Sequence, residues 1–108
     1  MGAITTGTAL QRVVAGKKVA VLCWATWCPF ARKFKPVWDA LIKTAVETWQ
    51  PLEVLLDDER NPLWAELDVE VVPTVLFFDN GRIVKRLDGK LGVGLTEQDL
   101  VSALRSSP

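Results

Sequence analysis

Residues 18–32 read KVAVLCWATWCPFAR, and this stretch carries the strongest structural signal in the chain. Its first part, Lys18 to Trp24, is a nearly continuous apolar run, which predicts a central strand buried on both faces. Pro29 suits the first turn of a helix. Apolar residues then recur at spacings of three and four, which predicts a long helix over 30–49. Cys28 therefore lies where a buried strand passes into a long helix.

The rest of the chain alternates between strand and helix patterns. We expect helices over 8–15, 62–67 and 96–105, further strands over 52–57, 74–78 and 82–87, and an extra edge strand near 3–5. Asn80-Gly81 is a strong hairpin signal, and Thr96 with Asp99 fits a capping box. Strand-helix-strand units pair in parallel, whereas the hairpin adds antiparallel strands. The sequence predicts one α/β domain over 1–108, with a mixed sheet and helices on both faces.

Composition narrows the classes of function. The 108 residues contain thirteen basic and thirteen acidic side chains and no long apolar run, so we expect neither nucleic-acid nor membrane binding. The chain has no histidine, which excludes a Cys-His dyad and histidine-ligated metal sites. We expect no metal, no cofactor and a monomer. The first residues lack the pattern of a signal peptide, which favours the cytoplasm while leaving the compartment open.

Two motifs resemble those of the thioredoxin family. WATWCPFAR at 24–32 resembles its active-site segment, and VPT at 72–74 followed by FFDNG at 77–81 resembles its cis-proline segment and hairpin. The resemblance covers nearly the whole chain and implies a thioredoxin fold. It also implies that Cys28 is the attacking cysteine and that Pro73 is cis and faces it. The implied substrate groove consists of Trp27, Pro29, Phe30, Val72 and Pro73.

The two cysteines have different expected roles. Cys28 lies at a helix N-terminus, whose free N–H groups favour the nucleophilic thiolate, and we expect its side chain to be exposed. Cys23 lies inside the apolar run, where a free cysteine behaves as a small core residue. It is also too far along the strand to form a disulfide with Cys28.

Ala31 departs from the family pattern, because the resemblance places a second cysteine there. A thiol three residues after Cys28 would resolve a mixed disulfide, and alanine cannot. Two explanations remain open: a natural monothiol protein, or a Cys→Ala variant of a CPFC protein. Leu22 occupies the place where many thioredoxins have a buried aspartate, which slightly favours the natural monothiol.

We therefore expect a thiol–disulfide oxidoreductase whose Cys28 attacks disulfides in extended polypeptides. Completion of the cycle needs an outside thiol, and the candidates are glutathione and a thioredoxin-reductase-like donor. One alternative is a non-catalytic peptide-binding module. Another is a glutaredoxin-like monothiol protein that binds glutathione or an Fe–S cluster.

Overall fold

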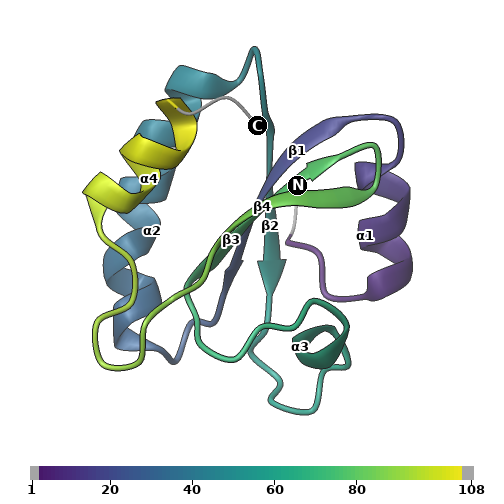
Figure 1. Ribbon diagram of the computed structural model, residues 1–108. Coiled ribbons are helices and arrows are strands. Elements are labelled where there is room, and N and C mark those ends of the chain that lie inside the picture. The colour runs from purple at the N-terminus through teal and green to yellow at the C-terminus, as the bar shows by residue number, and fades with distance from the viewer. Residues whose placement is uncertain (1–2, 106–108) are drawn as a thin grey trace.

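A four-stranded mixed sheet forms the centre of the protein, whose computed structural model describes residues 3–105 (Figure 1). The strand order is β2-β1-β3-β4. β1 pairs in parallel with β2 and antiparallel with β3, and β3 and β4 form the hairpin. The mixed sheet is confirmed, with strands β1 (Lys18–Trp24), β2 (Gln50–Leu55), β3 (Thr74–Asp79) and β4 (Arg82–Leu87).

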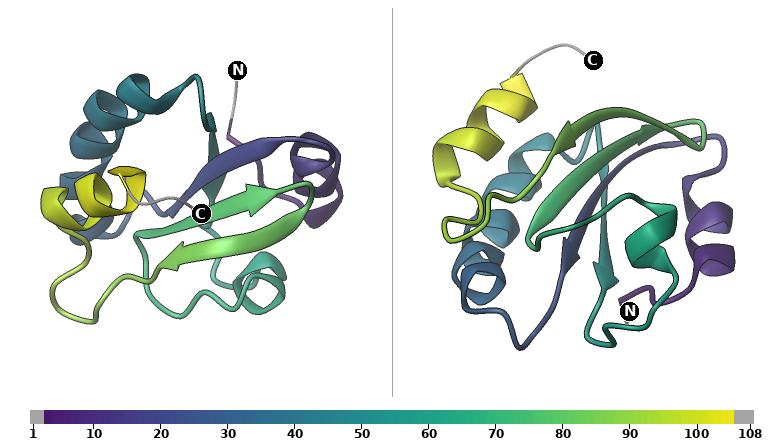
Figure 2. Two further views of the ribbon diagram at one scale, coloured as in Figure 1. Left: turned by 45° about the horizontal axis from the view of Figure 1, so that its top comes forward. Right: turned by 60° about the horizontal axis from the view of Figure 1, so that its bottom comes forward.

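Helices cover both faces of this sheet, as predicted (Figures 1 and 2). α2 (Pro29–Ile42) and α4 (Glu97–Arg105) lie on one face, and α1 (Gly7–Val14) and α3 (Leu63–Glu66) lie on the other. Leu22 packs in the core beneath α2 and α4, whereas Val21 and Cys23 pack in the core beneath α1 and α3. This alternation explains why the whole of β1 is apolar, since successive side chains of a strand point to opposite faces.

The predicted helix over 30–49 is too long. α2 ends at Ile42 and a short 3₁₀ turn, η1 (Lys43–Ala45), follows it. The Thr44 hydroxyl donates to the Leu41 carbonyl at 2.7 Å, a side-chain bond that competes with continued helix. Trp49 is buried after this turn and packs edge-on against Phe77, with 4.9 Å between ring centroids. Its helical spacing in the sequence was therefore coincidental.

The β2 strand begins and ends two residues earlier than predicted. It covers 50–55 and not 52–57. The expected edge strand near 3–5 is a single parallel bridge between Ile4 and Val54. Across residues 3–105, no helix has both the length and the apolar character needed to cross a membrane.

Candidate functional site

Cys28 caps the N-terminus of α2, the longest helix of the fold. Its backbone N–H donates to the Ala25 carbonyl at 3.2 Å, and its carbonyl accepts from the Arg32 N–H at 3.0 Å. These bonds hold the residue between the end of β1 and the first turn of α2. Pro29 follows at the first helical position, where its missing N–H leaves no donor unsatisfied.

The expectation that Cys28 is exposed is wrong. The residue is 8% exposed and belongs to the core cluster that also contains Ala31 and Val72. The reason is a contact distant in sequence: the Cys28 Sγ lies 3.5 Å from the Val72 carbonyl oxygen, so the segment before β3 covers part of the sulfur. The free thiol donates a weak hydrogen bond to this oxygen.

The segment over Cys28 is itself well anchored. The Val72–Pro73 peptide bond is cis. The Thr74 hydroxyl donates to the Val71 carbonyl at 2.7 Å and accepts from the Gly89 N–H at 3.1 Å. A Cβ at Gly89 would collide with the Pro73 carbonyl oxygen, so this close approach requires glycine. Residues 71–74 thus have a defined position above the sulfur.

Asp57 also organises the site, and the sequence motifs did not identify it. Its carboxylate accepts from the Thr26 N–H at 2.6 Å and from the Thr26 hydroxyl at 2.7 Å. Its backbone carbonyl accepts from the indole N–H of Trp27 at 2.9 Å. On the other side, Arg32 donates to the Thr26 carbonyl at 2.9 Å. The loop before Cys28 is therefore fixed both from the segment that follows β2 and from α2. A hint in the sequence was a carboxylate at the end of the strand predicted over 52–57.

The second cysteine lies in the core, as expected. Cys23 is fully buried, and this burial raises the pKa of its thiol to about 12. Both cysteines are free thiols. Ala31 is fully buried in the same cluster as Cys28, so its methyl group occupies space that a second thiol would fill. Leu22 is fully buried on the opposite face of the sheet, among apolar side chains of α2.

Aromatic side chains border Cys28 on the surface. Trp27 is 47% exposed and Phe30 is 38% exposed. The structure thus brings together the predicted Cys28, Trp27, Pro29, Phe30, Val72 and Pro73. Within residues 3–105, no three His, Cys, Asp or Glu side chains are grouped closely enough to hold a metal ion.

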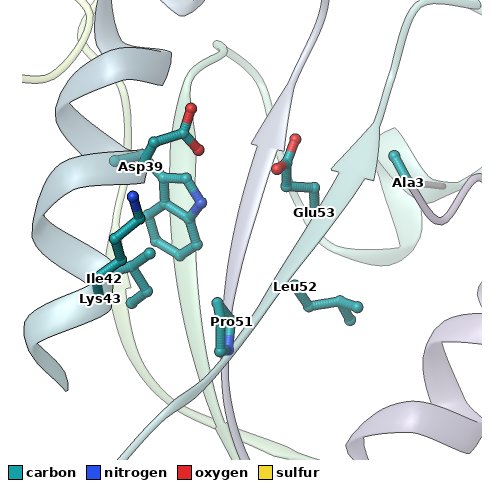
Figure 3. Close-up of a pocket in the computed structure, with 8 residues that line it drawn as sticks. Ala3, Asp39, Ile42, Lys43, Pro51, Leu52 and Glu53 are labelled. Atoms are coloured by element: carbon teal, nitrogen blue, oxygen red, sulfur yellow. The ribbon is translucent and has the colours of Figure 1, made fainter. Parts of the chain in front are cut away.

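A separate hollow lies away from Cys28, between α2 and β2 (Figure 3). It has a volume of about 510 Å³, and Asp39 and Glu53 line it. Lys35 bonds to both carboxylates, at 2.7 Å and 3.2 Å. Trp38, which also lines it, is ten residues beyond Cys28, or about 15 Å along the helix. This hollow therefore has no part in the chemistry of Cys28.

Comparison with known families and curated proteins gives concordant results. The family model for thioredoxin matches residues 3–106. The thioredoxin of Mycolicibacterium smegmatis is 30% identical over 91 residues, which cover 83% of this chain and 81% of the relative. A bifunctional thioredoxin reductase/thioredoxin of Mycobacterium leprae is 38% identical over 88 residues, which cover 80% of this chain but 19% of that protein.

Solved structures show the same similarity in three dimensions. The thioredoxin of Malassezia sympodialis superposes with a TM-score of 0.78 at 26% identity, covering 94% of this chain and 85% of the other. The thioredoxin of Fasciola hepatica superposes with a TM-score of 0.76 at 25% identity, covering 96% of both chains. The predicted thioredoxin fold is therefore confirmed.

Proposed function

Because the chain belongs to the thioredoxin family, we propose that it is a thiol–disulfide oxidoreductase that acts on protein disulfides through Cys28. The observation that carries the proposal is the position of the Cys28 sulfur at the N-terminus of α2, 3.5 Å from the Val72 carbonyl. The free N–H groups of the first helical turn stabilise an anion, and the thiolate is the nucleophile in disulfide exchange.

The first step is attack on a substrate disulfide. The Cys28 sulfur forms a bond to one substrate sulfur, and the other substrate sulfur leaves as a thiolate. A substrate chain in extended form pairs with the backbone of Val72 next to the attacking atom, which is a form of strand addition. Trp27, Pro29, Phe30 and Pro73 form the walls of this groove. Asp57 acts as a positioning residue, because it holds the loop that carries Trp27 and Cys28.

Reduction of a substrate needs a second thiol from outside the chain. Ala31 has no sulfur, and Cys23 is fully buried on β1 with a raised pKa. An external thiolate therefore attacks the Cys28 sulfur of the mixed disulfide and releases the substrate as a thiol. Glutathione and a thioredoxin-reductase-like donor are the proposed sources of electrons. The bifunctional relative from Mycobacterium leprae, whose name combines a reductase with a thioredoxin, supports the second source.

Mass spectrometry of the intact protein tests the first step. The reduced chain is incubated with an excess of a peptide dimer whose two copies are joined by one disulfide, without any other thiol, so that the leaving copy diffuses away. We expect the mass to increase by one covalently bound peptide, and Cys28→Ser to abolish the increase. Cys23→Ala is the matched control and should still form the adduct, because Cys23 is fully buried whereas Cys28 is 8% exposed. An unmodified wild-type chain, or an adduct on Cys28→Ser, would show that the proposal is wrong.

A non-catalytic peptide-binding module is the competing function, and the burial of Cys28 and the absence of a thiol at Ala31 favour it. Addition of glutathione after adduct formation distinguishes the oxidoreductase from the binding module. Release of free peptide and repeated turnover indicate an oxidoreductase, whereas a persistent one-to-one adduct indicates a module that captures its partner.

A further inference from the structure

Arg86, on β4, holds the carboxyl end of α3. Its Nη1 donates to the Leu67 carbonyl at 3.0 Å, and its Nη2 donates to the Asp68 carbonyl at 2.8 Å. A helix leaves its last carbonyls without partners inside the helix, so they need donors from elsewhere. α3 ends at Glu66, and Arg86 supplies two such donors directly after it. The guanidinium therefore completes the end of a helix that lies far from it in the sequence.

The backbone at this helix end has an unusual conformation. Asp68 has a φ of +53°, in the left-handed region that residues with a Cβ rarely adopt. Its N–H donates to the Ala65 carbonyl at 3.1 Å. The next N–H, of Val69, donates to the Trp64 carbonyl at 2.8 Å, which completes a Schellman motif. Because Arg86 binds the carbonyl of the left-handed residue itself, it helps to set the direction in which the chain leaves α3.

A carboxylate after β4 fixes the guanidinium in turn. Asp88 accepts from the Arg86 Nη2 at 2.9 Å and from its Nε at 3.2 Å, a two-point contact that orients the guanidinium plane. The next residue, Gly89, donates its N–H to the Thr74 hydroxyl at the start of β3. The end of β4 and the two residues after it therefore hold the segment 67–74 at both of its ends.

The segment between these two anchors covers Cys28. The Val72 carbonyl oxygen lies 3.5 Å from the Cys28 Sγ. A hollow with a volume of about 230 Å³ is lined by residues of this segment and by Arg86. The segment therefore has room to shift toward β4 when the guanidinium is removed.

From these contacts, we infer that Arg86 is a positioning residue for the reaction of Cys28. The inference rests on the proposed exchange chemistry, and Arg86 acts through the backbone of the segment 67–74. In this position the Val72 carbonyl covers part of the sulfur, which hinders small reagents. The same backbone is aligned to pair with an extended substrate chain, which favours polypeptide disulfides. Loss of Arg86 should therefore change these two reactions of Cys28 in opposite directions.

The variant Arg86→Gln tests this inference in two reactions of Cys28. One is alkylation by iodoacetamide, and the other is adduct formation with the disulfide-linked peptide dimer. We expect alkylation to become about threefold faster, because less of the sulfur is covered. We expect adduct formation to become about tenfold slower, because the pairing backbone is displaced. Rates that change in the same direction, or that do not change, would overturn the inference.

Cys23 reports in the same experiment whether the variant is folded. It is fully buried, so iodoacetamide should reach it only when the core opens. Mass spectrometry after proteolytic digestion measures labelling at each cysteine separately. We expect Cys23 to stay unlabelled while Cys28 reacts. Equal acceleration of labelling at Cys23 and Cys28 would mean that Arg86 only stabilises the fold, which would overturn the inference.

A second variant, Arg86→Lys, tests whether the shape of the guanidinium matters. Lysine keeps the charge next to Asp88 but lacks the planar fork that spans the carbonyls of Leu67 and Asp68. Both rates should change in the same directions as in Arg86→Gln, by smaller factors. Rates equal to those of the parent would show that the charge alone suffices, and the positioning role would be wrong.

Arg82→Gln is the matched control, because it removes the same charge at the other end of β4, beside the hairpin turn. Both rates should stay within about twofold of those of the parent. An effect as large as that of Arg86→Gln would contradict the inference. If the parent itself forms no adduct, the exchange proposal is wrong, and the alkylation rates still show whether Arg86 keeps the sulfur covered. If the parent forms the adduct and Arg86→Gln forms it equally fast, only the positioning role is wrong.

Discussion

At the scale of single residues, we propose that Ala31 limits the chemistry of Cys28. It is fully buried one helical turn after Cys28, so a thiol there would face the sulfur of Cys28. We predict that Ala31→Cys forms a disulfide between Cys28 and the introduced thiol on oxidation. It should reduce insulin with dithiothreitol about tenfold faster or more, because an intramolecular thiol has a high effective concentration. The helix should survive, since cysteine costs only about 0.5 kcal/mol relative to alanine.

The controls for Ala31→Cys use the same position and the same assay. Ala31→Ser introduces a similar volume without sulfur, and Ala31→Cys combined with Cys28→Ser removes the attacking thiol. Both should show no gain in insulin reduction. If the unchanged chain already matches Ala31→Cys, an external thiol resolves the intermediate efficiently, and Ala31 does not limit turnover.

Asp57 is the second residue whose contacts predict a measurable effect. Asp57→Ala removes the acceptor for the Thr26 N–H and hydroxyl but keeps the backbone bond to Trp27. Because the side chain is exposed, we expect the free energy of unfolding to fall by about 1 kcal/mol, measured by urea denaturation. Asp58→Ala is the matched control, because its side chain bonds only to Arg60 in the same loop, and it should change stability by less than about 0.5 kcal/mol. If both variants lose the same free energy of unfolding, Asp57 does not anchor the loop before Cys28.

At the scale of elements, the cap of α4 makes stability depend on pH. The Asp99 carboxylate accepts from the Thr96 N–H at 2.9 Å, and this bond lowers the pKa of Asp99. The stability that this capping bond contributes is therefore fully present above the unfolded pKa of Asp99, about 3.9. It is lost as the pH falls through the lower pKa that Asp99 has in the folded protein. Asp99→Asn should lower the urea midpoint near pH 7 and have a smaller effect at about pH 3.

A double-mutant cycle isolates this cap from other effects of the substitution. The Thr96 hydroxyl accepts from the Asp99 N–H at 3.1 Å, so the two residues form one reciprocal unit. Thr96→Ala alone should cost about 1 kcal/mol. The double variant near neutral pH should lose less than the sum of the single variants. Additive losses, or an Asp99→Asn effect that does not depend on pH, would disagree with the capping-box interpretation.

At the scale of the whole molecule, the contact of Gly89 with Pro73 joins the end of β4 to the segment over Cys28. A Cβ at Gly89 would overlap the Pro73 carbonyl oxygen and also lie 3.3 Å from the Val71 carbonyl oxygen. We expect Gly89→Ala to lower the free energy of unfolding by about 1–3 kcal/mol, because the backbone must move to make room. It should also slow adduct formation at Cys28, since the moved segment contacts the sulfur.

Gly7→Ala is the matched control for this prediction. Its added Cβ would lie too close to the Glu66 carboxylate, the end of a side chain that can rotate away, and would make an ordinary contact with Leu63 at 3.6 Å. Gly7 begins α1, where alanine is a better helix former than glycine. This variant should be as stable as the parent or more stable, and its adduct should form at the parent rate. A Gly89→Ala variant with the stability of Gly7→Ala would rule out a required close approach at Gly89.

The sequence by itself determined the order of elements, the buried character of β1, the Asn80-Gly81 hairpin and the cap at Thr96. It also determined the family and the core location of Cys23. These features depend on residues close together in the chain, because helix periods, strand alternation, turns and caps are local. Local reasoning was wrong about the end of α2, because the spacing of Trp49 matched a helix that the chain does not form.

Only the tertiary structure decided how the site is assembled. The burial of Cys28 comes from Val72, the loop before it is fixed by Asp57, and the loop after β4 approaches Phe30 closely at Gly94. Each pair is separated by more than thirty residues of chain, as the numbers show. A periodic pattern carries no information about such contacts, because they arise only when strands and loops from different parts of the chain pack side by side.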